Sequence, residues 1–240
     1  MLDKYFKELV SYVERTDSKY RQLYEPNLPV HPIPFFGNIK TAKVLTVGVN
    51  PSNGEFKNRG WPEKLSSEQL TDRLLNYFSL ESCPPHPWFD DWKTALNILG
   101  LSYKRGEVAH LDISPRPTIP MGQVSDSDKE TFLDMVKNDI EWFFRVLPLS
   151  EDAKLLMMAG SVTKKYYLVE LLKELAENYG FKLLFEFERG GDAPTSFHKL
   201  KSSTINLPTF FCGISPSARN SKLLIQRVSE KREKLLAYLE

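Results

Sequence analysis

Apolar and polar positions repeat with two periods along the 240-residue chain. Short apolar runs bounded by turn-forming residues predict five buried strands, at about 42–49, 108–113, 154–159, 182–187 and 209–214. Apolar residues spaced three or four apart predict amphipathic helices at about 2–24, 66–78, 90–99, 125–146, 163–178 and from about 221 to the end. Strands that alternate with helices are typical of a parallel sheet covered on both faces. We therefore expect a three-layer α/β/α fold with a mainly parallel central sheet of four to five strands.

No shift in composition divides the chain, so we expect one domain over residues 1–240. Within it, residues 1–40 form an N-terminal helix and a proline-rich extended arm that pack on the rest. The polar segment 189–203 contains a Gly-Gly pair and is expected to be an irregular loop, in which His198 is exposed to solvent.

Composition limits the classes of function. Lys and Arg number 32 against 31 Asp and Glu, so nucleic acid binding would need a local basic patch. The two cysteines lie far apart and the four histidines lack ligand spacing, so we expect no metal, no iron–sulfur cluster and no other cofactor. No apolar run reaches the ~20 residues of a membrane span, and the N-terminus lacks a signal-peptide core. We expect a soluble intracellular monomer, cytoplasmic or at the nucleoid or nucleus.

Three polar side chains stand at the ends of predicted strands, each near a proline: Asn50, Asp112 and Ser215. The carboxyl ends of parallel strands meet at one edge of a sheet, where open α/β folds bind their ligands. Each turn taken alone is an ordinary Asn-Pro or Ser-Pro turn. Three of them at strand ends favour a small-ligand site.

The segment Gly48-Val49-Asn50-Pro51-Ser52 resembles the first motif of the uracil-DNA glycosylase superfamily, especially its mismatch-specific and single-strand-selective branches. Ser215-Pro216-Ser217-Ala218-Arg219-Asn220 is similar to the second motif, in the right order and also at a strand end. Gly60-Trp61-Pro62 resembles the segment that supplies a base-stacking aromatic residue. Asp112-Ile113-Ser114-Pro115 falls where single-strand-selective members carry Asn-x-Cys-Pro, whose Asn contacts the uracil edge.

This resemblance implies an enzyme of base-excision repair that flips a nucleotide of single- or double-stranded DNA into a pocket. Asn50 would hold the attacking water, and Trp61, or Phe56 in its place, would stack on the base. The implied catalytic residues are Asn50, Asp112 and Ser215, and the implied base-binding residues are Val49, Phe56, Trp61 and Asp112. The implied DNA-binding residues are Ser52, Lys57, Arg59, Pro216, Ser217, Arg219, Asn220 and Ser221, with Arg116 and Lys222 adding to a basic rim.

Two positions depart from the family pattern. Ser215 stands where some branches have His, and the loss of such a donor to a developing oxyanion costs ~10²–10³ in rate. Asp112 stands in place of Asn, and an ionised Asp can only accept hydrogen bonds. Three roles for Asp112 stay open: it contacts a base edge that presents donors, such as the amino group of cytosine or adenine; it activates the water; or it caps a turn or pairs with Arg116.

We therefore expect a glycosylase that hydrolyses the N-glycosidic bond of a damaged or mismatched base, uracil or a deaminated purine, in DNA. The alternative is a binding protein of the same fold that recognises a base, nucleotide or DNA lesion without efficient cleavage, because Ser215 and Asp112 weaken the chemistry. A third hypothesis is a hydrolase of free nucleosides. The first hypothesis requires Asn50, Asp112 and Ser215 to line one cleft with Trp61 on its wall.

Overall fold

The computed structural model describes residues 1–28, 30–57, 61–80, 84–120, 123–159, 168–186, 195–203, 205–212 and 221–240. Its helices are α1 (Leu2–Thr16), α2 (Ser67–Leu75), α3 (Trp88–Ile98), α4 (Lys129–Val146), α5 (Leu168–Leu175), α6 (Ser221–Glu230) and α7 (Arg232–Ala237). Its strands are β1 (Phe35–Phe36), β2 (Val44–Gly48), β3 (Val108–Asp112), β4 (Leu155–Ala159), β5 (Phe181–Glu186), β6 (Thr195–Ser202) and β7 (Asn206–Cys212). This alternation confirms the α/β class.

The strands form one mixed sheet in the order β1-β3-β2-β4-β7-β6-β5. Strands β3, β2, β4 and β7 run parallel, whereas β1 is antiparallel to β3, and β6 is antiparallel to both β5 and β7. The prediction of a mainly parallel sheet of four to five strands is therefore wrong. Strand β1 has two residues, too short for a periodic pattern, and β6 lies in the segment expected to be a loop.

Strand β6 forms because its side chains alternate between the core and solvent. His198 and Leu200 are buried, whereas Lys199 is half-buried and Lys201 is exposed. Its backbone pairs with β5 on one side and β7 on the other, so both edges of a polar strand are hydrogen-bonded. His198 is 2% exposed, which contradicts the expectation that it faces solvent.

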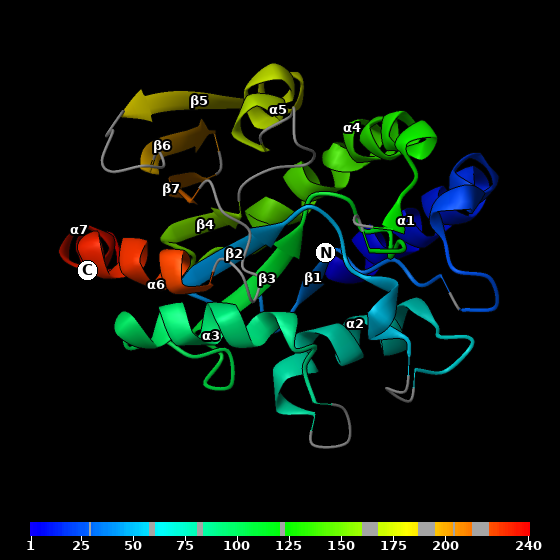
Figure 1. Ribbon diagram of the computed structural model, residues 1–240, viewed down its shortest axis with the longest axis horizontal. Helices are drawn as coiled ribbons and strands as arrows, with labels where there is room; N and C mark the ends of the chain where they lie inside the picture. The colour runs from blue at the N-terminus through cyan, green and yellow to red at the C-terminus, as the bar shows by residue number, and fades with distance from the viewer. Residues whose placement is uncertain are drawn as a thin grey trace.

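Helices cover both faces of the sheet (Figure 1). Helices α3 and α6 pack on each other on one face, α4 and α5 lie on the other, and α1 packs against α2 and α4 near β1. The last predicted helix is two helices, since Lys231 separates α6 from α7. Within the described ranges, no helix combines the length and apolar character needed to cross a lipid bilayer.

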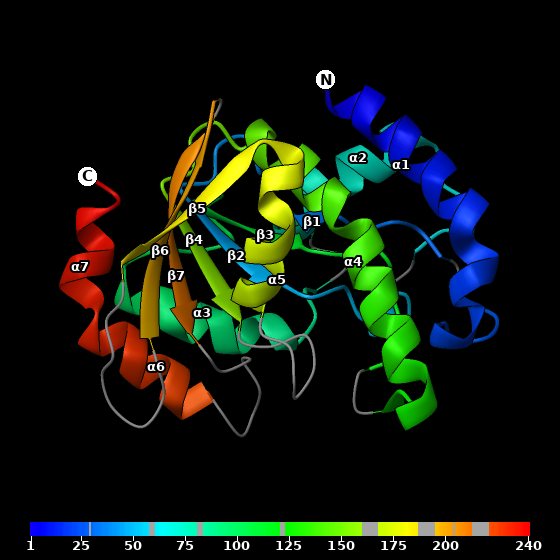
Figure 2. The same cartoon turned by 90° about the horizontal axis from the view of Figure 1, so that it is seen from above.

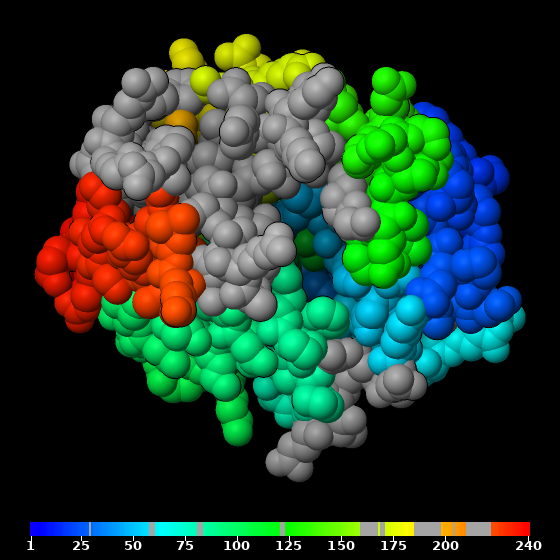
Figure 3. All heavy atoms as spheres, viewed as in Figure 1, coloured from blue at the N-terminus to red at the C-terminus, as the bar shows by residue number. Residues whose placement is uncertain are grey.

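The parallel strands end at one edge, the lower edge in Figure 2. The chain runs from β2 through α2 and α3 to β3 on one side, and then returns through α4 to β4 on the other side of β2. The helices that follow β2 (α2 and α3) and the helix that follows β4 (α5) lie on opposite faces of the sheet. The carboxyl ends of β2 and β4 therefore form a topological switch point, the place where open α/β sheets bind ligands. Figure 3 faces this edge and shows a hollow whose floor has the blue and green colours of the chain near the ends of β2 and β3.

Candidate active site

The turns that follow β2 and β3 continue side by side beyond the strands. The Ser114 amide donates to the Val49 carbonyl at 2.9 Å, and the Thr118 amide donates to the Pro51 carbonyl at 3.2 Å. The Asn53 amide donates in turn to the Thr118 carbonyl at 2.9 Å. These backbone bonds hold the two turns as one unit, so the residues at the ends of both strands have fixed relative positions.

The side-chain amide of Asn50 is fixed by three acceptors. Its Nδ2 donates to the carbonyl oxygens of Pro51 at 2.9 Å and Arg116 at 3.0 Å, and to Thr118 Oγ1 at 2.9 Å. The Thr118 hydroxyl itself donates to the Ile119 carbonyl at 3.0 Å. Carbonyl oxygens only accept, so the atom they surround must be the NH₂ group. Among the described residues none donates to Oδ1, which is therefore the atom that Asn50 can offer to a water or a ligand.

A buried ion pair holds the second turn from behind. The Arg116 guanidinium contacts Asp139 Oδ2 at 3.0 Å and Tyr24 Oη at 3.0 Å, and both charged side chains are fully buried. Asp139 also accepts from Ser114 Oγ at 2.6 Å and from Tyr12 Oη at 2.8 Å. Burial raises the pKa of the Asp139 carboxyl, and the Arg116 charge opposes this rise. The expectation that Arg116 belongs to a basic rim is wrong, because this ion pair places its charge in the core.

The sequence motifs did not identify two residues of this arrangement, Thr118 and Asp139. Asp139 lies on the buried face of α4 with Val136, Ile140 and Phe143. An acid within an apolar helical stripe indicates a buried partner, and this is the signal from which the Arg116 pair could have been predicted. Thr118 could have been found only from the conformation of the turn.

Asp112 lies beside Gly48, its neighbour across the β2–β3 pair. A Cβ on Gly48 would stand 2.7 Å from Asp112 Oδ1, so the glycine leaves the space that the carboxyl group occupies. Asp112 is 2% exposed, and its Oδ1 lies 3.4 Å from His110 Nε2. Its Oδ2 is buried and has no hydrogen-bond partner among the described residues. Burial raises the pKa of Asp112, and the adjacent His110 opposes the rise.

His110 continues a chain of polar groups below Asp112. Its Nδ1 lies 2.8 Å from Thr46 Oγ1, which lies 2.7 Å from Tyr103 Oη. The imidazole packs edge-on to the Trp88 ring at 4.9 Å, at the start of α3. Asp112 is therefore the last member of a buried chain that ends at the carboxyl edge of the sheet.

The candidate base-stacking residues Trp61 and Phe56 pack against each other, with ring centroids 5.1 Å apart. The His31 ring stacks on Trp61 at 6.1 Å, and the Arg73 guanidinium lies 4.6 Å from the centre of the Trp61 ring. Trp61 is 9% exposed, so a base that stacks on it would displace part of this packing.

Two of the candidate DNA-binding residues, Ser52 and Lys57, have local partners in the structure. Ser52 Oγ accepts from the Gly54 amide at 3.1 Å and caps a short 3₁₀ turn. The Lys57 ammonium pairs with Glu25 at 2.6 Å, and Ser221 is the first residue of α6. The remaining predicted residues lie outside the described residues: Arg59, Ser215, Pro216, Ser217, Arg219 and Asn220. Thus, of the predicted site residues, Val49 and Asn50 directly follow β2, and Asp112 is the last residue of the adjacent strand β3.

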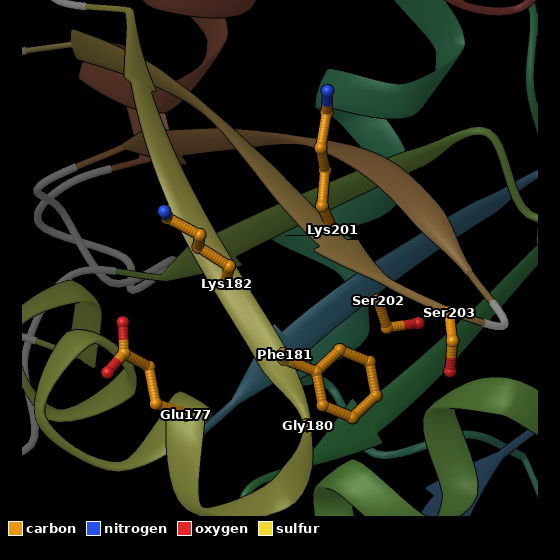
Figure 4. Close-up of a pocket in the computed structure, with 7 residues that line it drawn as sticks. All are labelled: Glu177, Gly180, Phe181, Lys182, Lys201, Ser202 and Ser203. Atoms are coloured by element: carbon orange, nitrogen blue, oxygen red, sulfur yellow. The ribbon is translucent and has the colours of Figure 1, made fainter.

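A second hollow lies between the start of β5 and the end of β6, at the opposite edge of the sheet (Figure 4). Its lining residues are Glu177, Gly180, Phe181, Lys182, Lys201, Ser202 and Ser203. None of its polar residues is buried, so it lacks the convergent, desolvated polar groups of a ligand site.

The described part of the chain contains no cluster of three or more His, Cys, Asp or Glu side chains that could hold a metal ion. In comparisons with known proteins, no protein-family model matches the chain, and no curated protein matches it.

Proposed function

We propose that the protein has a uracil-DNA glycosylase-like fold and hydrolyses the N-glycosidic bond of a flipped uracil or deaminated purine in DNA. The observation that best supports this proposal is the fixed amide of Asn50. Three acceptors hold Nδ2, so Oδ1 keeps one orientation at the carboxyl edge of the sheet. A positioned acceptor at this point suits a residue that orients an attacking water.

The chemistry needs orientation more than base strength. The bond between the base nitrogen and the sugar C1′ breaks with its electron pair going to the base, and the sugar becomes oxocarbenium-like. Water then adds to C1′, and the proton that it releases, directly or through solvent, neutralises the departed base anion. An amide oxygen is a weak base, but water that attacks a cation needs little deprotonation, so the contribution of Asn50 would be to hold the water in place.

The site around Asn50 also supports recognition of a base. Asp112 is the last residue of the neighbouring strand β3 and places a buried carboxyl oxygen without a described partner at the same edge. The surface at this edge is hollowed (Figure 3). A concave site with a few oriented polar groups is the usual form of a small-ligand pocket.

The test uses single- and double-stranded oligonucleotides that contain uracil, hypoxanthine, xanthine or a G·T or G·U mismatch. After incubation, alkali cleaves the DNA at abasic sites. We expect scission with at least one substrate and a loss of about 100-fold or more in Asn50→Ala, from lost water positioning. Asn76→Ala is the matched control, because its amide is also hydrogen-bonded but lies on the exposed end of α2.

Scission that survives in Asn50→Ala would refute the assigned role of Asn50. No scission of any substrate together with salt-dependent DNA binding would replace the proposal with a binding protein. Neither scission nor DNA binding would leave the hydrolysis of free nucleosides, which release of base from inosine or uridine would measure.

A further inference from the structure

The two oxygens of the Asp112 carboxyl group differ: Oδ1 has a neighbour that can share a proton, and the buried Oδ2 has no hydrogen-bond partner among the described residues. Oδ1 lies near His110 Nε2 at 3.4 Å and over the backbone of Gly48. Oδ2 is buried and lacks a partner among the residues that the structure describes. A buried polar atom without a partner costs free energy, which a ligand that supplies the partner would recover.

In both favourable arrangements of this pair, the proton lies between Asp112 Oδ1 and His110 Nε2. If His110 carries a proton on Nε2, it points at Oδ1, and the carboxylate offers lone pairs at Oδ2. If Asp112 carries the proton instead, Oδ1 is its favourable place, because there it faces the ring nitrogen. A proton on Oδ2 would have no acceptor among the described residues. In each favourable state, Oδ2 is a hydrogen-bond acceptor.

We propose that Asp112 Oδ2 accepts a hydrogen bond from a ring N–H of the bound base, and that His110 is the positioning residue that keeps this oxygen an acceptor. This proposal takes its class of ligand, a base in DNA, from the proposed function. It adds which of the deaminated bases the site prefers. Asp112 is 2% exposed, so a base that reaches it meets Oδ2 without water, and solvent does not correct a mismatched contact.

An obligate acceptor discriminates among the deaminated bases. In uracil and xanthine, the ring N–H that faces outward lies between two carbonyl groups, and each carbonyl oxygen repels a nearby acceptor. In hypoxanthine, the N1–H lies between one carbonyl and a C–H group. The site should therefore favour hypoxanthine over uracil and xanthine, by about 10-fold in binding or excision if one repulsive contact is removed.

The experiment compares oligonucleotides that differ only in the target nucleotide: deoxyinosine, deoxyuridine or deoxyxanthosine. Each is used in a cleavable form and in a 2′-fluoro form that resists cleavage, so that binding is measured separately from hydrolysis. The wild-type protein should bind the inosine oligonucleotide about 10-fold more tightly than the uridine one. Asp112→Asn should shift the preference toward uridine, because the amide can donate to a carbonyl.

Two His110 variants test the positioning role. His110→Asn keeps a polar group near the position of Nδ1 and its partner Thr46 but removes Nε2, so the preference for inosine should fall toward unity. His110→Gln places its polar group near Nε2 and should keep more of the preference. A purely structural His110 would change the melting temperature of both variants without changing the ratio of the two affinities.

Equal affinity of the wild-type protein for inosine and uridine, or no binding of any oligonucleotide, would overturn the inference. So would an Asp112→Asn variant that folds and keeps the wild-type ratio. If inosine is preferred in binding but no base is released, the inference stands and the hydrolysis proposed above fails. If uracil is excised in preference to hypoxanthine, the hydrolysis stands and the inference fails.

Discussion

Replacing Asp139 by Asn tests whether the turn that holds Asn50 is fixed from the core. The substitution keeps the shape of the side chain and one of its two oxygens, so an acceptor remains for either Ser114, which donates to Oδ2, or Tyr12, which donates to Oδ1, and the negative charge is removed. Arg116 then becomes a fully buried cation without its counter-ion, since both side chains of the pair are inaccessible to solvent. Breaking a buried pair in this way costs about 3–5 kcal/mol in the free energy of unfolding.

The remaining contacts of Arg116 place the expected loss near the lower end, about 3 kcal/mol. Its guanidinium still contacts the hydroxyls of Tyr24 and Thr16 and lies 5.0 Å from the centre of the Tyr20 ring. For a chain of this length, each kcal/mol lowers the melting temperature by about 2–4 °C, so Asp139→Asn should melt about 6–12 °C below the wild-type protein.

Thermal unfolding followed by circular dichroism measures this shift. The control is Glu8→Gln, which breaks the half-exposed pair of Glu8 with Arg145. An exposed pair contributes at most about 1 kcal/mol, so the control should melt within about 4 °C of the wild-type protein. If Asp139→Asn falls in the range of the control, the buried pair does not anchor the turn.

Three further predictions concern other parts of the structure. Gly48→Ala places a methyl 2.7 Å from Asp112 Oδ1 and should cost about 1–3 kcal/mol in urea unfolding, with a smaller cost in an Asp112→Ala background; additive costs would contradict the contact. Thr118→Val removes one acceptor of the Asn50 amide, so NMR should show faster hydrogen exchange of that NH₂ group than in Thr118→Ser; equal rates would exclude the hydroxyl as a support. Burial lowers the pKa of His198 to about 4, whereas the unfolded chain titrates near 6.5, so this residue should remove up to about 3 kcal/mol of stability as the pH falls from 6.5 to 4. Urea unfolding across this range should show that the free energy of unfolding changes less steeply with pH in His198→Gln than in the wild-type protein. An unchanged slope would refute the lowered pKa of His198.

The parallel strands were predictable because their signals are local. Apolar β-branched runs that stop at proline-containing turns gave β2 and β3 within about two residues of their observed ends. Strand β6 was not predictable from the sequence, because its Thr, Ser, His and Lys residues resemble a loop. Its stability comes from pairing with β5 and β7. Such pairing depends on residues far away in the sequence, which no local pattern reports.

The candidate site likewise has one feature that the sequence predicts and others that it does not. The adjacency of Asn50 and Asp112 follows from parallel strands that end in polar turns, a pattern visible in the sequence. The partners of the Asn50 amide do not follow, because they are backbone carbonyls and a hydroxyl supplied by the conformation of a distant turn. The charge of Arg116 suggested that its side chain lies on the surface. Only Asp139, an acid on the apolar face of α4, indicated a buried partner and therefore a position of Arg116 in the core.

The two polar side chains at the strand ends present the same kind of atom. The donors of Asn50 are all engaged, which leaves Oδ1, and Asp112 leaves Oδ2. Two acceptors suit two donors, the O–H of a water and the N–H of a base. An acceptor beside the base also opposes negative charge on it, so departure of a base as an anion is disfavoured near Asp112. In the proposed reaction, a purine that takes a proton from solvent on a ring nitrogen leaves as a neutral base, whereas uracil has no such basic nitrogen. The leaving group and the base edge would therefore favour the same substrate, hypoxanthine.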